Sequence, residues 1–183
     1  MTDGTVLLVV ILGVLLLWYF SFSATRLDRL HARVEGAAGA LDAQLVRRSA
    51  SAMQLATSGL LDPASSLLLA DSAHEAREAE GTTGPAREQA ESDLTRALHA
   101  VLDDVGEVAV VRANPRGSAL LDELATACHR TTLARRFHND AVRAARVVRR
   151  KRLVRALRLA GHAGWPASFE ADDSVPLALD PAP

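Results

Sequence analysis

The feature that most constrains this chain is an uncharged, mostly aliphatic run near its amino terminus, TVLLVVILGVLLLWYFSFSA, from Thr5 to Ala24. A helix of that length reaches across a hydrocarbon core of about 30 Å. The aromatic residues at the end of the run, from Trp18 to Phe22, are typical of a membrane interface. The sequence therefore predicts a single transmembrane helix.

A cleaved signal peptide is the competing interpretation of this run. A signal peptide begins with positive charge, but Asp3 is the only charged side chain before the run, and residues 21–24 form a poor cleavage site. Arg26, Arg29 and Arg33 follow the run directly, and positive charge is retained on the cytoplasmic side. We therefore expect a retained anchor in the cell membrane, with the N-terminus outside and the rest of the chain in the cytoplasm.

Composition favours helices for the remainder of the chain. Ala, Leu and Arg dominate, and they are strong helix formers, whereas aromatic residues make up only 4%. The net charge of -1 argues against a general nucleic-acid binder. A single cysteine, Cys128, excludes an intramolecular disulfide framework and a cysteine-rich zinc site. We expect an all-α protein with no nucleic-acid partner.

Four helices are predicted by apolar residues that recur in steps of three and four. The first helix continues from the anchor until SGLLDP interrupts it, and Asp62 caps the second. Pro85 begins the third helix, which includes Val105 and Val108 and ends at RANPRGS. Ser118 caps the fourth, whose apolar stripe reaches Val148.

Short links between amphipathic helices favour an antiparallel up-and-down arrangement. The predicted fold is thus an N-terminal transmembrane helix that continues into an elongated antiparallel four-helix bundle. The predicted domains are an anchor over residues 1–25, the bundle over 26–160, and a flexible, acidic, Pro-containing tail over 161–183.

The end of the fourth helix carries a dense run of basic residues. Because this helix is long enough to return along the length of the first, we expect the run at the membrane surface, where the anionic leaflet attracts each cation by about 1 kcal/mol. A solvated helix end, whose cations complement the helix dipole, is the alternative. The predicted membrane-surface residues are Arg143, Arg146, Arg149, Arg150, Lys151, Arg152, Arg155 and Arg158.

Several segments, in the right order, carry a resemblance to a known family. They are ALDAQLVRR from Ala40, LTRALHAVL from Leu94, the pair Ala113 and Asn114, ARRFHNDAVR from Ala134, and WPASFEADD from Trp165. Together they resemble the LemA family, membrane-anchored helical proteins of bacteria. The resemblance spans nearly everything after the anchor, and it implies an elongated four-helix bundle of undetermined biochemical activity.

The polar residues in the two strongest of these blocks are candidate functional residues. Within the second block, Arg136 and Asp140 are one i,i+4 pair, and Arg135 and Asn139 are another. Charged contacts between the first and fourth helices that fix their register are one interpretation, and a surface for docking a partner is the other. The residues concerned are Asp42, Gln44, Arg47, Arg48, Arg135, Arg136, Asn139 and Asp140.

Motifs for catalysis are weak in this sequence. HEARE places His74 and Glu78 one turn apart without a third ligand at readable spacing, and Cys128 with His129 points two side chains in different directions on a helix. We expect no catalytic residue, no metal and no cofactor.

The sequence thus predicts a non-enzymatic scaffold or interaction module with membrane lipid and an unknown protein as partners. An accessory in envelope stress or membrane proteolysis, and an unrecognised enzyme, are the alternatives.

Overall fold

The computed structural model describes residues 2–150 and 164–179, and over these residues the regular structure is entirely helical. The chain divides into two compact units. Unit 1 comprises Met1–Gly36 and Asp140–Ala167, and unit 2 comprises Ala37–Asn139 and Ser168–Pro183. The prediction of an all-α protein is confirmed for the described part of the chain.

The first helix, α1, runs without a break over Thr2–Ala56. No proline occurs in this stretch, so every backbone amide beyond the first turn can continue the hydrogen-bond ladder. The predicted continuation of the amino-terminal helix into the amphipathic segment is confirmed. The structure describes the side chains of α1 except those at positions 2, 3, 16, 17, 20, 23, 24 and 27. Among the described residues, no helix is long and apolar enough to cross a membrane.

The second helix, α2, covers Pro63–Glu78 and begins where the sequence predicted. Asp62 Oδ1 accepts hydrogen bonds from the backbone amides of Ala64 and Ser65 over 2.9 and 3.1 Å. A hydrogen bond from the Ser65 side chain, and after it those from the backbone amides of Ser65 and Ala64, lower the pKa of the Asp62 carboxyl. The amide groups of a first helical turn lack helical partners, so this cap fixes the start of α2.

The predicted third helix is two helices. Helix α3 covers Pro85–Leu102 and α4 covers Val105–Ala113. Asp104 Oδ1 accepts from the amides of Gly106 and Glu107 over 2.7 and 3.1 Å, which starts a new helix at Val105. The prediction of one continuous helix is wrong here because the cap made by Asp104 outweighs the apolar spacing of Val105 and Val108.

The fifth helix, α5, covers Pro115–Arg149 and begins earlier than Ser118. Asn114 Oδ1 accepts from the amide of Arg116 over 2.9 Å, and Pro115 occupies the first helical position, where its missing N–H costs nothing. Gly117 lies so close to α4 that a Cβ atom would stand 2.2 Å from the carbonyl oxygen of Val111. Glycine at this position therefore lets α4 and α5 meet.

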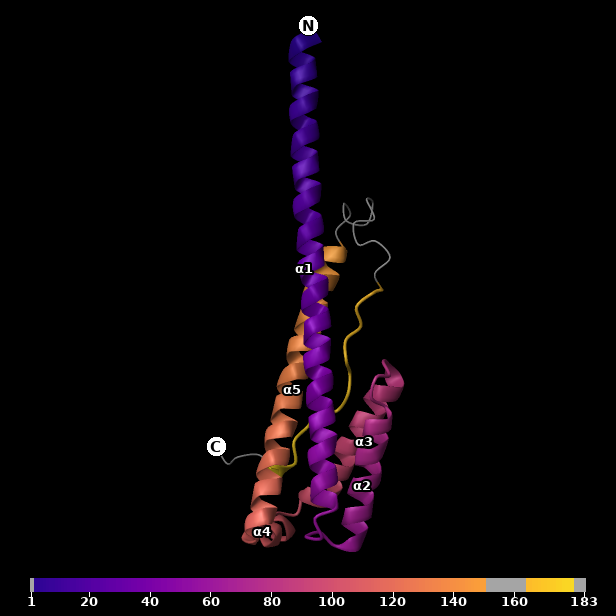
Figure 1. Cartoon of the computed structure of the whole chain (residues 1–183), viewed down its shortest axis with the longest axis vertical. Coiled ribbons are helices and arrows are strands. Elements are labelled where there is room, and N and C mark those ends of the chain that lie inside the picture. Colours follow the sequence, from indigo (N-terminus) through magenta and orange to yellow (C-terminus); the bar gives the residue numbers. More distant parts are fainter. Residues whose placement is uncertain (1, 151–163, 180–183) are drawn as a thin grey trace. The chain divides into compact units, whose positions relative to one another are not determined.

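The core of unit 2 draws on α1 to α5 and on η1, a 3₁₀ turn over Leu177–Leu179. Helices α2 and α3 lie side by side (Figure 1). Of the apolar positions assigned to the predicted third helix, Val108 is buried but Val105 is 65% exposed. The buried apolar residues that pack together include Ala52, Leu55, Leu69, Ala73, Leu94, Leu98, Leu102, Val108, Leu121, Leu124 and Leu179.

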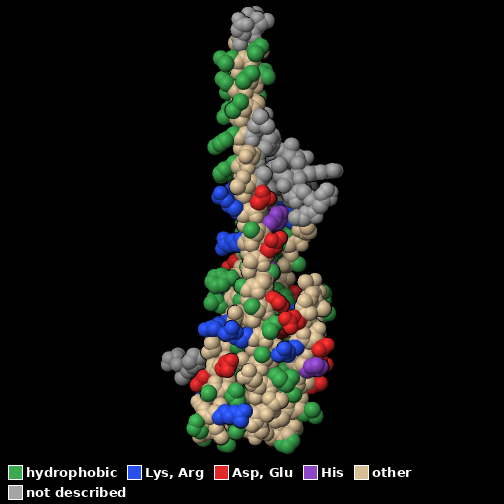
Figure 2. Space-filling model, in the orientation of Figure 1, with side chains coloured by type: hydrophobic (Ala, Val, Ile, Leu, Met, Phe, Trp, Pro, Cys, Tyr) green, Lys and Arg blue, Asp and Glu red, His purple; other side chains and the backbone are tan. Residues whose placement is uncertain are grey.

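Unit 1 contains the start of α1 and the end of α5. An open groove is lined by Arg26 and Leu30 of α1 and by Arg143, Ala144 and Val147 of α5, among others. Apolar side chains cover the visible face of the amino-terminal part of α1, and charged side chains follow them along the helix (Figure 2).

Candidate functional site

Arg48 lies on the buried face of α1. Positions 41, 45, 48, 52 and 55 follow one another in steps of four and three, so Arg48 stands in the same row as Leu45 and Ala52. The residue is 1% exposed. Because an unpaired charge is costly to bury, a guanidinium in this row requires partners inside the protein.

The partners of Arg48 come from α3. Its Nη2 atom donates to Oε2 and to the backbone oxygen of Glu91 over 2.7 and 2.9 Å, and its Nη1 atom donates to Oγ1 of Thr95 over 3.0 Å. Arg87 Nη2 lies 3.1 Å from Oε1 of Glu91, and Arg87 Nη1 donates to the carbonyl oxygen of Ala76 over 2.9 Å. This buried ion network, Arg48, Arg87, Glu91 and Thr95, joins α1, α2 and α3.

Glu91 is fully buried at the centre of the network. Burial raises the pKa of its carboxyl, while the guanidinium groups of Arg48 and Arg87 act in the opposite direction. Asp42 lies at the exposed edge, 3.6 Å from Arg87 Nη2. Two cations therefore meet two carboxylates, and the buried groups are committed to one another rather than to a ligand.

The carboxy-terminal strap, residues 168–179, belongs to unit 2. Its residues 168–176 have no regular secondary structure and lie against α3 and α5, and the strap ends in the turn η1. Asn139 of α5 forms two hydrogen bonds with the backbone of Phe169: its Nδ2 donates to the carbonyl oxygen over 3.1 Å, and its Oδ1 accepts from the amide over 2.9 Å. An amide side chain that pairs with both backbone groups of one residue fixes the position and direction of the strap.

Helix α3 binds the strap in the same manner three residues further on. Ser92 Oγ accepts from the amide of Asp172 over 3.1 Å, and Thr95 Oγ1 donates to the carbonyl oxygen of Asp172 over 2.7 Å. Glu88 Oε1 accepts from the amide of Glu170 over 3.0 Å. Thr95 also accepts from Arg48, so the strap is connected to the buried ion network.

Asp173 is the strap side chain held most firmly. Arg135 of α5 donates to its two carboxylate oxygens through Nε and Nη2 over 2.7 and 2.8 Å. This bidentate contact with Asp173 raises the pKa of Arg135. Thr132 Oγ1 donates to the carbonyl oxygen of Asp173 over 3.0 Å. Two side chains of α5 thus hold Asp173, one through its carboxylate and one through its backbone.

A chain of hydrogen bonds closes the strap over the end of α3. His99 Nδ1 lies 3.0 Å from Oδ2 of Asp103, and His99 Nε2 lies 3.0 Å from Oγ of Ser174. A hydrolase triad has the same order of carboxylate, imidazole and hydroxyl. Here, however, Ser174 Oγ donates to Oδ1 of Asp172 over 2.8 Å, and that second carboxylate opposes the negative charge of an acyl-transfer intermediate. These contacts hold the strap against the end of α3, and they lack the environment that acyl transfer requires.

The predicted polar signature is spread over several contacts. The predicted pairing of Arg135 with Asn139 and of Arg136 with Asp140 is replaced by contacts of Arg135 and Asn139 with the strap. Asp140 Oδ1 instead lies 3.3 Å from Arg143 Nη2. The signature residues Arg47 and Arg136 are exposed. The backbone oxygen of Gln44 accepts from Thr131 Oγ1 over 3.3 Å, which is a contact between α1 and α5.

Four of the eight predicted membrane-surface residues are described, and all four lie in unit 1. Arg146 Nε donates to the carbonyl oxygen of Pro166 over 2.8 Å, and Arg149 binds the carbonyl oxygen of Gly164 and stacks 5.1 Å from the ring centre of Trp165. Arg143 and Arg150 are exposed. Lys151, Arg152, Arg155 and Arg158 lie outside the described residues.

The weak catalytic motifs are not assembled into a site. His74 and Glu78 are both exposed on α2, and in the described ranges no group of three possible metal ligands comes together. Cys128 is 2% exposed and belongs to the apolar core of unit 2. Burial raises the pKa of this thiol, which disfavours the reactive thiolate.

Sequence reasoning missed most partners in this site. Arg87 and Glu91 precede Leu94 and Leu98 by steps of four and three, so the row on α3 contained a signal that two charged residues point inward. No comparable periodicity marks an extended segment, and the contacts made by Asp172 and Asp173 could not be derived from spacing.

Comparison of the chain with family models, with curated proteins and with solved structures gives no match. The site is therefore interpreted from its own geometry.

Proposed function

We propose that this chain is a single-pass membrane protein of the LemA type, with a cytoplasmic helical bundle that acts as a non-enzymatic interaction module. The observation that carries the interaction role is the strap: side chains of α3 and α5 hold an extended acidic segment by its backbone. The polar side chains of α3 and α5 thus bind the backbone of a peptide segment, the strap.

Membrane anchoring is supported by the order of side chains along α1. Residues 5–24 contain no charge, and the described side chains from Val6 to Val10 are each more than half exposed. Contiguous exposed apolar surface marks a membrane or protein contact. The length of the run favours the membrane.

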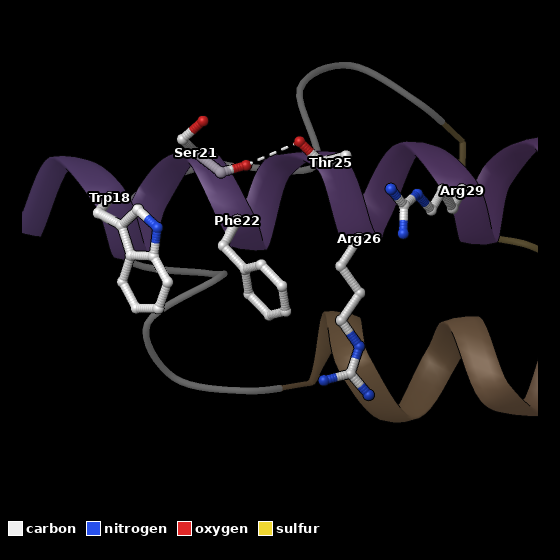
Figure 3. A pocket seen from close by; sticks show the side chains of 6 residues that line it. All are labelled: Trp18, Ser21, Phe22, Thr25, Arg26 and Arg29. Carbon is white, nitrogen blue, oxygen red and sulfur yellow. Dashed lines mark hydrogen bonds between the residues drawn. The ribbon is translucent and has the colours of Figure 1, made fainter.

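The end of this run resembles a membrane interface. Trp18 and Phe22 stack with ring centres 6.1 Å apart, and Arg26 and Arg29 follow on the same face of the helix (Figure 3). Figure 3 also shows the Arg26 side chain pointing toward a neighbouring helix, and the groove that Arg26 shares with Arg143 identifies that helix as α5. Aromatic rings followed by arginines are expected where hydrocarbon gives way to anionic headgroups on the cytoplasmic side.

An up-and-down bundle of α1, α2, α3 and α5 is the architecture we propose for the cytoplasmic part. Its support is a core to which all four helices contribute, and a buried ion network that ties three of them. Helix α4 then serves as a short link at one end, where it packs on α3 and η1.

Membrane fractionation tests the proposal directly. The full chain should stay with membranes during alkaline extraction and keep its N-terminus, and a cytosol-only reporter fused after Pro183 should be active. A double change of Val10→Lys and Leu12→Arg should release the protein, because charge at the centre of a span is costly. The matched control, Leu67→Lys and Leu68→Arg on the exposed face of α2, should leave it in the membrane. A mature chain that begins near Ala24 would contradict the anchor, and a reporter active only outside the cell would reverse the topology.

A further inference from the structure

The strap is bound as a peptide is bound, by its main chain. Asn139 binds the amide and carbonyl of Phe169, and Ser92 together with Thr95 binds the amide and carbonyl of Asp172. Recognition of an extended segment through its main chain gives affinity that does not depend on most of its side chains. A second segment of suitable sequence could make the same bonds.

Two features of the strap carry selectivity. Asp173 receives the bidentate contact of Arg135, and Ala171 is buried, with 8% of its surface exposed, so a larger side chain here would have to displace its neighbours. The neighbouring residues Glu170 and Asp172 expose their side chains. The site therefore requires a small residue followed, two positions later, by a carboxylate.

The two halves of the strap are held differently. In residues 168–174 Ala171 alone is buried, and the other contacts are polar. Residues 175–179 bring Leu179 into the core and pack Val175 and Ala178 against it. A hydrogen bond contributes little net free energy because water replaces it, so the first half can open while the second half stays docked.

We propose that the surface formed by Glu88, Ser92 and Thr95 of α3 and Thr132, Arg135 and Asn139 of α5 is a peptide-binding site. Its resident occupant is residues 168–174 of the chain itself. Its external ligand is an extended acidic segment of a partner protein, with the pattern small residue, any residue, aspartate or glutamate. The inference rests on the proposed role as an interaction module, and it names the partner's chemistry.

The charged contacts of the site favour an acidic segment as its ligand. Arg135 supplies the cation that meets Asp173 of the bound segment, and the nearby charges of Glu170 and Asp172 add to that attraction.

A labelled peptide of residues 166–176, PASFEADDSVP, tests the proposal with the full chain in mild detergent. The wild-type chain should bind it weakly because the strap occupies the site. The Asp173→Ala chain, whose own strap has lost its charged contact, should bind the unchanged peptide about tenfold more tightly. A chain with Glu123→Ala, which removes an exposed carboxylate elsewhere on α5, should behave as the wild type.

Variants of the peptide separate recognition from simple charge attraction. Against the Asp173→Ala chain, a peptide with Asp173→Ala should bind about tenfold more weakly, and a scrambled peptide of equal charge should not bind. Adding Arg135→Leu to the chain should remove binding while helicity by circular dichroism is unchanged.

Equal affinity of the wild-type and Asp173→Ala chains, or equal binding of the scrambled peptide, would overturn the proposal. A dimer of the Asp173→Ala chain by light scattering, dissociated by added peptide, would assign the site to strap exchange between copies instead. None of these results depends on membrane fractionation, so failure of the peptide site and failure of the anchor are distinguishable.

Discussion

Arg48 and Arg143 are both arginines on long helices, but their surroundings are opposite. Arg48 in unit 2 is 1% exposed and uses its guanidinium on Glu91 and Thr95. The Arg143 side chain in unit 1 is 76% exposed, and its contact with Asp140 at 3.3 Å joins two exposed groups. The buried charge of Arg48 is paired within the protein, whereas the exposed charge of Arg143 can also contact a lipid or a partner protein.

Arg146 and Arg149 form an intermediate class. They lie near the end of α5 and bind backbone oxygens of residues 164–166. The basic run is thus not uniform, because part of it orders the chain that follows and part of it stays exposed. Removing a buried charge from unit 2 should therefore lower the free energy of unfolding. Removing exposed charges from the end of α5 should instead weaken binding to acidic lipid.

The largest effect should come from placing an unpaired charge at a buried apolar position of α3. Leu94 is 0% exposed and belongs to the core, so Leu94→Asp should cost about 4 kcal/mol or more, because the carboxylate loses water and finds no cation. Urea unfolding of the full chain in detergent, followed by circular dichroism, measures this. Arg150→Asp, at an exposed position, should shift stability by about 0.5 kcal/mol or less. Similar midpoints for the two variants would remove the distinction between the regions.

The next largest effect should come from breaking the buried ion network. Glu91→Leu leaves Arg48 and Arg87 without their carboxylate and should cost about 3–5 kcal/mol in the same unfolding assay. Replacing all three charges, with Arg48→Met, Arg87→Met and Glu91→Leu, should recover much of this loss, since no unpaired charge remains. The exposed change Glu123→Leu serves as control. A triple variant less stable than Glu91→Leu alone would mean that the side chains of Arg48 and Arg87 stabilise the fold in ways other than by pairing with Glu91.

Much of the fold could be predicted because it follows from periodicity and caps. Asp62 and Pro63 mark the start of α2, and Pro85 marks the start of α3. These signals act on the adjacent backbone, so they do not depend on tertiary packing. The break between α3 and α4 was missed because the apolar spacing continues through Asp104, although that residue makes the cap. Spacing reports which face is buried but not whether the backbone is interrupted.

The candidate site was predicted only in part. Arg48, Arg135 and Asn139 were chosen as a polar signature, and all three make specific contacts. Their partners lie 43, 38 and 30 residues away in the sequence, and two of the three belong to an extended segment with no periodic pattern. The sequence identified which residues need partners, but the identity of each partner depends on tertiary packing.

A smaller effect should appear when the exposed charges of the basic run are removed. A fragment that begins at Arg26 should be soluble and helical, because its apolar residues lie on seams, and it should bind vesicles that contain acidic lipid. Each exposed cation contributes about 1 kcal/mol near such a surface, so Arg143→Gln with Arg150→Gln should weaken binding by roughly tenfold or more. Binding should also fall with added salt, which screens contacts beyond about 8–10 Å.

The control for this measurement is a pair of exposed arginines outside the basic run. Arg47→Gln with Arg136→Gln removes the same charge from unit 2 and should change vesicle binding little. Equal loss from both pairs would mean that net charge, and not the end of α5, determines binding. A fragment that does not distinguish acidic from neutral vesicles would contradict the membrane-surface assignment.

The smallest effect concerns the pH dependence of the strap. The backbone amide of Ser174 and its hydroxyl donate to Oδ1 of Asp172, and these bonds lower the pKa of that carboxyl below its ordinary value of 3.8. A lowered pKa in the bound form means that the ionised group stabilises docking above the ordinary pKa, and that this contribution is lost as pH falls through the lower value. Affinity of the 166–176 peptide for the Asp173→Ala chain, measured from neutral pH downward, should therefore decrease in the acid range. The comparison is with a peptide carrying Asp172→Asn, whose affinity should fall less steeply over the same range. An identical decrease of affinity with pH for the two peptides would show that the hydrogen bonds from Ser174 to Asp172 do not contribute to docking. Arg135 and the main-chain hydrogen bonds would then hold the segment alone.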